Sequence, residues 1–228
     1  MNLARLFRQR HAPRCGIPPQ PIDDTALAAV RWVVVDLETT GLDIYRDEIL
    51  SIGAVTVAEG ALSMAGQFEC TVYQPDHRPG EATLLHEIAP SQVRTGQPLG
   101  QALQDFMDYA GSCVMVAYHA GFERRMLDRG LRREWAQRLQ HHFIDLAELA
   151  PMLHPDCQDR CHTLDDWQQH FHLTNSERHN AAADAMVSAE LLLIMLNRLA
   201  REGTNTLAEL DNRLARWRRL HRLRAVRL

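Results

Sequence analysis

Two acidic side chains, Asp36 and Glu38, directly follow a run of four apolar residues, Trp32 to Val35. Three of those four are valine, which favours a β-strand that is buried on both faces. Side chains two residues apart in a strand point to the same side, so the two carboxylates should project together. Neighbouring carboxylates with little hydration repel each other unless a cation lies between them. The pair therefore predicts a divalent metal site, with a solvated acidic turn as the alternative.

Two further acidic residues stand near the starts of expected helices. Glu123 follows an apolar strand at 113–117, and Asp184 lies one turn into an alanine-rich helix with His179 at its start. The small residues before Asp184 would let that helix approach a neighbouring element closely. With the first pair, these residues give four carboxylates and one histidine. Taken singly, Asp184 could equally be an exposed helix carboxylate and His179 an ordinary helix-start residue.

The three segments that hold these residues read DLETTG, YHAGFE and HNAAAD, in that order along the chain. This ordered set resembles the three motifs of the DnaQ-like 3′–5′ exonucleases, over roughly residues 30–200. The histidine of the third segment places the resemblance in the DEDDh branch, which includes the proofreading subunit of bacterial DNA polymerase III. Two positions depart from the family pattern. Glu123 stands where the family usually has Asp, and Tyr118-His119 stands where it usually has His-Asn.

The resemblance implies hydrolysis of single-stranded DNA from its 3′ end, with release of nucleoside 5′-monophosphates. It also implies two divalent ions, Mg²⁺ or Mn²⁺, about 3.5–4 Å apart. Asp36 would bridge the two ions, Glu38 and Asp184 would complete one site, and Glu123 would act mainly through water on the other. His179, with an ordinary pKa of about 6.5, would accept a proton from the attacking water.

Contacts to the terminal nucleotide are implied by the same resemblance. They fall on Thr39, Thr40, Gly41, Leu42, His86 and Phe122, although Glu87 replaces the glycine that usually follows the histidine. An exoribonuclease is the nearest alternative, because no residue here identifies a contact to a 2′-hydroxyl. The departure at Glu123 also leaves open a catalytically weak nucleic-acid-binding or scaffold module.

The remaining sequence predicts the elements that must hold these residues in place. Three early strands with short connections predict an antiparallel meander, and later strands alternate with helices, which indicates a mixed α/β sheet. The resemblance makes this a ribonuclease-H-like, five-stranded sheet flanked by helices, with an extra C-terminal helix. Beyond the first strand, further strands are expected at 48–57, 62–73, 113–117 and 143–144, and helices at 82–88, 99–109, 122–140, 145–153, 163–171, 179–201 and 206–223. The expected domains are a partly ordered lead-in at 1–29, the exonuclease domain at 30–201 and an Arg-rich helix at 202–228.

Composition favours a soluble cytoplasmic protein. Apolar residues make up 46% and charged residues 24% of the 228 positions, as in ordinary globular proteins. The apolar run at 191–196 is too short to span a bilayer, and residues 1–14 lack the apolar core of a secretory signal. The five cysteines are an odd, scattered number, which favours reduced thiols over a disulfide framework. We therefore expect a cytoplasmic location and no membrane partner.

The basic charge is concentrated at the C-terminal end. All 25 basic residues are Arg, and seven of them lie from Arg213 onward, where no acidic residue occurs. The chain as a whole carries −4, so the part before Arg213 carries −11, seven charges below the total. An apolar stripe runs along the same expected helix at Leu207, Leu210, Leu214 and Trp217. Because such a stripe needs cover, association with a polymerase or with a second copy ranks above DNA binding or a solvated helix face.

Four zinc-type ligands cluster later in the chain, at His154, Cys157, Cys161 and His162. Their spacing matches no common zinc finger, so a reduced loop without metal is the favoured interpretation. Asp145 follows a strand end and could lie near the metals, although a helix N-cap explains it equally well. Asp165 and Asp166 have the same two interpretations at the start of the next helix. Tyr118 and His119 are predicted to pack at the end of their strand.

Overall fold

The computed structural model describes residues 18–75, 88–174 and 180–225. The strands within them are β1 (Trp32–Thr39), β2 (Ile49–Ala58), β3 (Ala61–Thr71), β4 (Val114–Ala117) and β5 (Phe143–Asp145). The helices are α2 (Pro90–Arg94), α3 (Leu99–Ala110), α4 (Gly121–Trp135), α5 (Leu146–Leu153), α6 (Leu164–Phe171), α7 (Ala181–Arg201) and α8 (Leu207–Ala225), with 3₁₀ turns η2 (Leu27–Ala29) and η3 (Pro155–Cys157). Residues 1–17 of the expected lead-in and 82–87 of the expected helix lie outside the described residues.

The five strands form one mixed sheet in the order β3-β2-β1-β4-β5. β1, β2 and β3 pair in antiparallel fashion. β4 is parallel to β1, and β5 is parallel to β4. The meander closes through a tight turn at Glu59 and Gly60, which both have positive φ, whereas the parallel pairs are joined through helices, as parallel connections require. The predicted fold class is confirmed.

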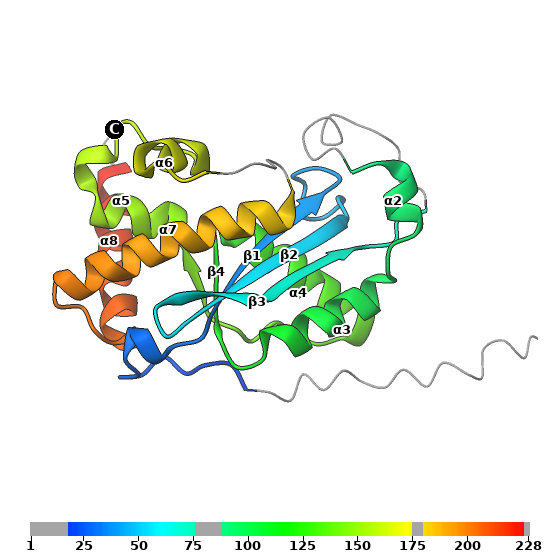
Figure 1. Cartoon of the computed structure of the whole chain (residues 1–228), viewed down its shortest axis with the longest axis horizontal. Helices are drawn as coiled ribbons and strands as arrows, with labels where there is room; N and C mark the ends of the chain where they lie inside the picture. The colour runs from blue at the N-terminus through cyan, green and yellow to red at the C-terminus, as the bar shows by residue number, and fades with distance from the viewer. Residues whose placement is uncertain (1–17, 76–87, 175–179, 226–228) are drawn as a thin grey trace, which may run out of the picture.

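Alternate side chains of β1 enter two different cores. Trp32 and Val34 belong to the core formed with α7, α5 and α8, whereas Val33 and Val35 belong to the core formed with α3 and α4. Figure 1 shows α7 crossing the front of the sheet, with α3 and α4 behind it. Because side chains alternate along a strand, the even-numbered positions of β1 continue toward the α7 face.

Several element ends differ from the predicted ones. α4 ends at Trp135, before the predicted position 140, because Ala136 has a left-handed φ of 56° and the chain turns back so that the Leu139 amide donates to Asp128. Asp145 caps α5 as predicted, accepting a hydrogen bond from the Ala147 amide. The predicted N-caps of α6, Asp165 and Asp166, were wrong. Thr163 is the N-cap there, and Asp166 completes the capping box from the third helical position because its carboxylate can reach back to the Thr163 amide.

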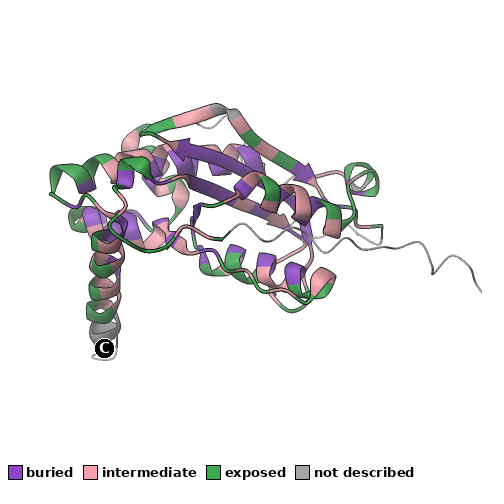
Figure 2. Ribbon diagram, turned by 90° about the horizontal axis from the view of Figure 1, so that it is seen from below, coloured by how far each residue is buried: buried purple, intermediate pink, exposed green. Residues whose placement is uncertain are grey.

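Helix α8 is covered by the chain's own core. Leu207, Leu210 and Leu214 are all buried in the core that also contains α7, and Arg218 forms an ion pair with Glu148 of α5 at 2.6 Å. Figure 2 shows the buried start of α8 and its C-terminal part extending away from the body. Intramolecular packing therefore covers the three leucines of the stripe, whereas Trp217 is half-buried, and association through this helix stays a prediction.

Two further expectations concern the membrane and the thiols. No helix within the described ranges has both the length and the apolar content needed to cross a membrane. Of the five cysteines, the four in the described ranges are free thiols and all are buried. Cys15 lies outside those ranges.

Candidate active site

Three of the predicted carboxylates meet where β1 passes under the start of α7. Oxygen atoms of Asp36, Glu38 and Asp184 all lie within 4.8 Å of one another. Asp36 and Glu38 come from alternate positions of β1 on the α7 face, and Asp184 comes from the first turn of α7. A strand and a helix that are far apart in the sequence thus build one acidic cluster.

The close approach of α7 depends on a glycine in the neighbouring strand. Gly53 lies directly opposite Asp36 in the pairing of β1 with β2. A β-carbon at Gly53 would lie 2.1 Å from the carbonyl carbon of Ala181 and 2.2 Å from the amide nitrogen of Ala182. Only glycine leaves room for the helix backbone at this distance. Gly53 therefore determines how near Asp184 can come to Asp36.

The start of α7 is also fixed by its cap. The side chain of Asn180 accepts a hydrogen bond from the Ala183 amide at 3.0 Å, and its own amide group donates to Glu69 of β3 at 3.3 Å. Such a cap satisfies a helix amide that would otherwise lack a partner. His179, the predicted general base, directly precedes Asn180 and lies outside the described residues, as does His86. Their predicted roles stay predictions.

Glu123, the fourth predicted carboxylate, comes from a different helix. It lies in the first turn of α4 and is only 6% exposed. Its Oε2 atom is buried and has no hydrogen-bond partner among the described residues. Glu123 is not one of the three residues whose oxygens lie within 4.8 Å, but its charge is close enough to act on Asp36. The predicted role of Glu123 as a metal ligand therefore stays a prediction.

Burial and mutual repulsion raise the pKa values of these carboxyl groups. Burial is the main reason that the pKa of Asp36 lies well above its ordinary range, and the charges of Glu123, Glu38 and Asp184 add to it. The pKa of Glu38 is raised to about 8 by burial and then by Asp184. The pKa of Glu123 is raised to about 8 by burial, with a further contribution from Asp145.

These features fit a divalent cation. The donor set consists of carboxylate oxygens, which Mg²⁺ and Mn²⁺ prefer. Nearby, the buried Oε2 atom of Glu123 has no hydrogen-bond partner among the described residues. A cation would also reduce the repulsion between the neighbouring carboxylates. Among the described residues, the cluster is thus a candidate metal site, as predicted from Asp36 and Glu38.

Asp145 caps α5 and also holds the backbone of the second motif at His119. Its Oδ1 atom accepts hydrogen bonds from the Ala147 amide at 2.9 Å and from the His119 amide at 3.0 Å. His119 has a positive φ of 64°, and its side chain is exposed. The prediction of strand-end packing was therefore wrong for His119, because Asp145 holds the backbone while the side chain faces outward. It was right for Tyr118, which is buried and donates to the His162 carbonyl at 3.1 Å.

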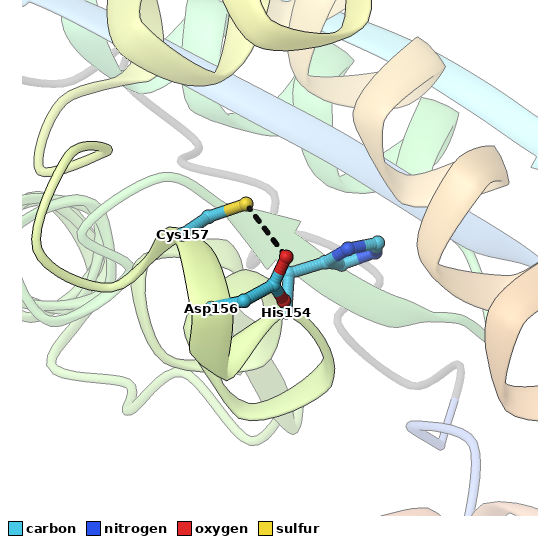
Figure 3. Close-up of side chains that lie close together, drawn as sticks. All are labelled: His154, Asp156 and Cys157. Carbon is cyan, nitrogen blue, oxygen red and sulfur yellow. Dashed lines mark hydrogen bonds between the residues drawn. The ribbon is translucent and has the colours of Figure 1, made fainter.

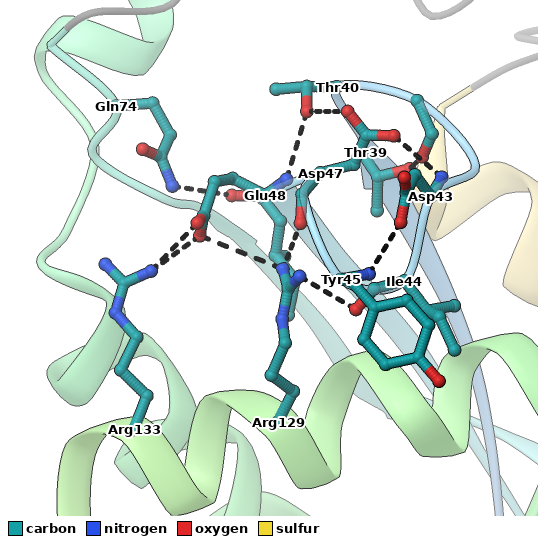
Figure 4. Close-up of polar contacts among 12 residues, drawn as sticks. Thr39, Thr40, Asp43, Ile44, Tyr45, Asp47, Glu48, Gln74, Arg129 and Arg133 are labelled. Carbon is teal, nitrogen blue, oxygen red and sulfur yellow. Dashed lines mark hydrogen bonds and ion pairs between the residues drawn. The ribbon is translucent and has the colours of Figure 1, made fainter.

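The loop after β1, which the motif predicts to hold the nucleotide, is organised by its own side chains (Figure 4). The Thr39 hydroxyl donates to the Gly41 carbonyl at 2.7 Å, and the Thr40 hydroxyl donates to Asp47 at 2.8 Å. Asp47 also accepts a hydrogen bond from the Asp43 amide at 2.7 Å. Both threonine hydroxyls therefore act within the loop, and what they fix is its shape beside the carboxylates.

Two arginines of α4 hold this loop from below, a role that the sequence analysis missed. Arg129 donates to the Ile44 carbonyl at 2.8 Å and to the Asp47 carbonyl. Arg133 forms an ion pair with Glu48 at 2.8 Å, and Figure 4 shows the two guanidinium groups side by side beneath the loop. Their spacing of four residues, which places both on one helix face, was the available signal.

Exposed apolar side chains lie on the same loop. Leu42 is 85% exposed and Tyr45 is 84% exposed, whereas Phe122 packs against the core behind the sheet. Large apolar side chains with this exposure next to a candidate active site can contact a ligand. The sequence analysis included Leu42 but not Tyr45.

The exonuclease family model, named RNase T, matches residues 33–192 of this chain. Relatives include the PolC-type DNA polymerase III of Oceanobacillus iheyensis, 28% identical over 80% of this chain and 12% of the relative. The PolC-type enzyme of Clostridium perfringens is 30% identical over 75% of this chain and 12% of that protein. The chain thus spans about an eighth of the length of these relatives.

Solved structures show the same fold. Exonuclease X in complex with 5′ overhanging duplex DNA has a TM-score of 0.57 and 24% identity, over 73% of this chain and 91% of that one. E. coli exonuclease I in complex with a dA16 oligonucleotide has a TM-score of 0.65 and 14% identity, over 75% of this chain and 42% of that one. The resemblance inferred from the three motifs is confirmed, and the chain belongs to the exonuclease family.

Proposed function

We propose that the protein is a metal-dependent 3′–5′ exonuclease that acts on single-stranded DNA ends and releases nucleoside 5′-monophosphates. The observation that carries this proposal is the meeting of Asp36, Glu38 and Asp184 within 4.8 Å, with Glu123 close enough to act on Asp36. Membership of the exonuclease family supports the reaction class. The DNA in the exonuclease I and exonuclease X structures supports the polymer.

Two divalent ions, Mg²⁺ or Mn²⁺, would be held by these four carboxylates and would stabilise charge on the attacking and leaving oxygens of the phosphodiester. The carboxylates give up the protons that their raised pKa values retain in the metal-free protein. Once deprotonated, the carboxylates would repel the anionic phosphodiester unless the cations lie between them. The raised pKa values therefore support an obligatory metal requirement.

The reaction is a displacement at phosphorus. A water oxygen forms a bond to the phosphorus atom, the bond from phosphorus to the 3′ oxygen breaks, and the shortened strand keeps a 3′-hydroxyl group. We assign acceptance of the water proton to His179, which directly precedes the Asn180 cap in the sequence. A histidine with a pKa near about 6.5 suits this role at neutral pH.

The loop after β1 would receive the terminal nucleotide. Its backbone is held by Arg129 and by the threonine hydroxyls, while Leu42 and Tyr45 extend into solvent. An exposed aromatic side chain such as Tyr45 can stack on an unpaired base, which contributes about 1–3 kcal/mol per base, and Leu42 adds an apolar contact surface. We therefore expect a preference for frayed or single-stranded 3′ ends. The 3′ end of a strand that a DNA polymerase is extending is a source of such ends.

The direct test is digestion of 5′-labelled single-stranded DNA and RNA of the same sequence, with Mg²⁺, Mn²⁺ or EDTA, resolved on a gel. The expected result is a ladder that shortens from the 3′ end, requires the metal and is stronger for DNA. A terminal 3′ phosphorothioate should slow the first step. Asp184→Asn, which keeps the size of the side chain and removes its charge, should abolish the ladder.

A matched control is Asp211→Asn, because Asp211 is a carboxylate of α8 that faces His142 at 3.3 Å, away from the carboxylate cluster. This variant should retain full activity. A ladder of equal strength on RNA would replace the DNA assignment with an exoribonuclease. Binding of both strands without a ladder under any metal would refute the enzyme and leave a nucleic-acid-binding module.

A further inference from the structure

A second group of metal-ligating side chains gathers around η3, away from the carboxylate cluster. Figure 3 shows His154, Asp156 and Cys157 at the end of α5. One ligand atom from each of the three lies within 4.8 Å of the other two. The Cys157 sulfur also lies 3.5 Å from Nε2 of His170, which comes from α6. Residues from three consecutive elements therefore converge on one thiol.

A second thiol completes the group. Cys161 follows Cys157 by one turn, with its amide donating to the Cys157 carbonyl at 2.9 Å and its thiol donating to the Asp166 carbonyl at 3.9 Å. Both are buried. Cys157 is thus surrounded by two imidazoles, a carboxylate and the second thiol.

The imidazole of His154 has one ring nitrogen without a hydrogen-bond partner among the described residues. Its Nε2 atom is buried and has no hydrogen bond within the part of the chain that the structure describes. The ring itself is held by edge contacts with Phe171 at 5.2 Å and Trp167 at 6.1 Å. A buried nitrogen that forms no hydrogen bond is unfavourable, and a metal ion would satisfy it.

We propose that Cys157, Cys161, His154 and His170 bind a structural zinc ion. In a tetrahedral zinc site with Zn–S near 2.3 Å and Zn–N near 2.0–2.1 Å, a sulfur and a nitrogen ligand lie about 3.5 Å apart. The Cys157–His170 distance of 3.5 Å matches this spacing. The hydrogen bond of 3.7 Å from the Cys157 thiol to Asp156 belongs to the metal-free form, because zinc binding releases the thiol proton.

The ligand chemistry separates this site from the active site. Two thiols and two imidazoles favour zinc, whereas the carboxylates on β1 and α7 favour Mg²⁺ or Mn²⁺. The zinc ion would tie the end of α5 to η3 and α6, where Trp167 is fully buried. His162, which the sequence pattern groups with these ligands, has its ring 3.3 Å from the Asp159 carbonyl, whereas Nε2 of His170 lies 3.5 Å from the Cys157 sulfur, although both side chains are exposed. His170 takes its place because α6 folds back over η3.

Zinc analysis of the purified protein tests the proposal. After dialysis against zinc and then against buffer, the wild-type chain should retain about one zinc ion, and its cobalt-substituted form should show a thiolate-to-cobalt charge-transfer band. Cys157→Ser and His170→Ala should lose the ion and the band. The matched controls Cys70→Ser and His162→Ala should keep both, and Asp36→Asn should keep the zinc ion while losing Mn²⁺ binding.

Three outcomes would overturn the proposal. One is a wild-type chain that retains no zinc and shows no charge-transfer band with cobalt, a readout that needs no variant to fold. Another is full retention of zinc by Cys157→Ser. The third is loss of zinc from Asp36→Asn, which would place the ion in the active site instead.

Discussion

Replacing Gly53 with alanine should disconnect Asp184 from the acidic cluster without touching a charged residue. The added β-carbon would lie 2.1 Å from the Ala181 carbonyl carbon, whereas an ordinary contact is at least 3.4 Å. The start of α7 must therefore retreat by about 1.3 Å, and backbone on both sides leaves no flexible side chain to absorb the change. Asp184, one turn further along the same helix, moves with it.

The expected effect on activity is larger than the effect on stability. A misplacement on the order of 1 Å in a catalytic constellation lowers the rate by about 100-fold. Overpacking of this kind reduces the free energy of unfolding by about 1–3 kcal/mol, which lowers the melting temperature by roughly 3–10 °C for a chain of this size. Digestion of labelled DNA at 20 °C, thermal melting and Mn²⁺ titration measure the three consequences.

Gly100→Ala is the matched control for this experiment. The nearest atom to its added β-carbon is the Glu134 carboxylate oxygen at 3.0 Å, the end of a flexible side chain. Because Gly100 lies inside α3, alanine should stabilise the helix by up to about 1 kcal/mol and leave activity unchanged. Wild-type activity, Mn²⁺ affinity and melting temperature in Gly53→Ala would refute the close-approach argument.

Three further predictions follow from the same site. In the metal-free protein, Glu38 and Glu123 retain protons at pH values between the ordinary carboxyl pKa and their raised pKa values of about 8. The folded state therefore binds more protons than the unfolded state, and the melting temperature should fall as pH rises from about 5 to 8. A melting temperature that rises over this range would contradict the raised pKa values. Adding Mn²⁺ at pH 7 should release at least about two protons, because Glu38 and Glu123 are mostly protonated there and the pKa of Asp36 is raised as well. Calorimetry in buffers of different ionisation enthalpy would count them, and a count near zero would contradict the raised pKa values. Arg129→Lys should lower kcat/KM with little change in Mn²⁺ affinity, because a single ammonium group cannot replace the two hydrogen bonds to the Ile44 and Asp47 carbonyls. Weaker Mn²⁺ binding with unchanged kcat/KM would instead show that the loop positions the metal rather than the substrate.

The sequence by itself determined the acidic pair on β1 and the class of the fold. Alternation along a strand requires Asp36 and Glu38 to share a face, whatever lies beyond them. The short connections among the first three strands required a meander, and helices between the later strands made those strands parallel. Local capping chemistry also identified Asp145 correctly, because an N-cap depends only on the residues beside it.

Tertiary structure alone decided which residues approach these carboxylates. The sequence of β2 gives no sign that Gly53 must be glycine. The requirement comes from the α7 backbone, which lies across Gly53 in the folded chain. Arg129 reads as one arginine among several on an exposed helix, and only the return of the loop after β1 gives it two carbonyl partners. The leucine stripe of α8 predicted an external partner, but the core beneath α5 and α7 already covers it. In each case the sequence specifies a side chain and its local element, whereas its partner depends on how distant elements pack.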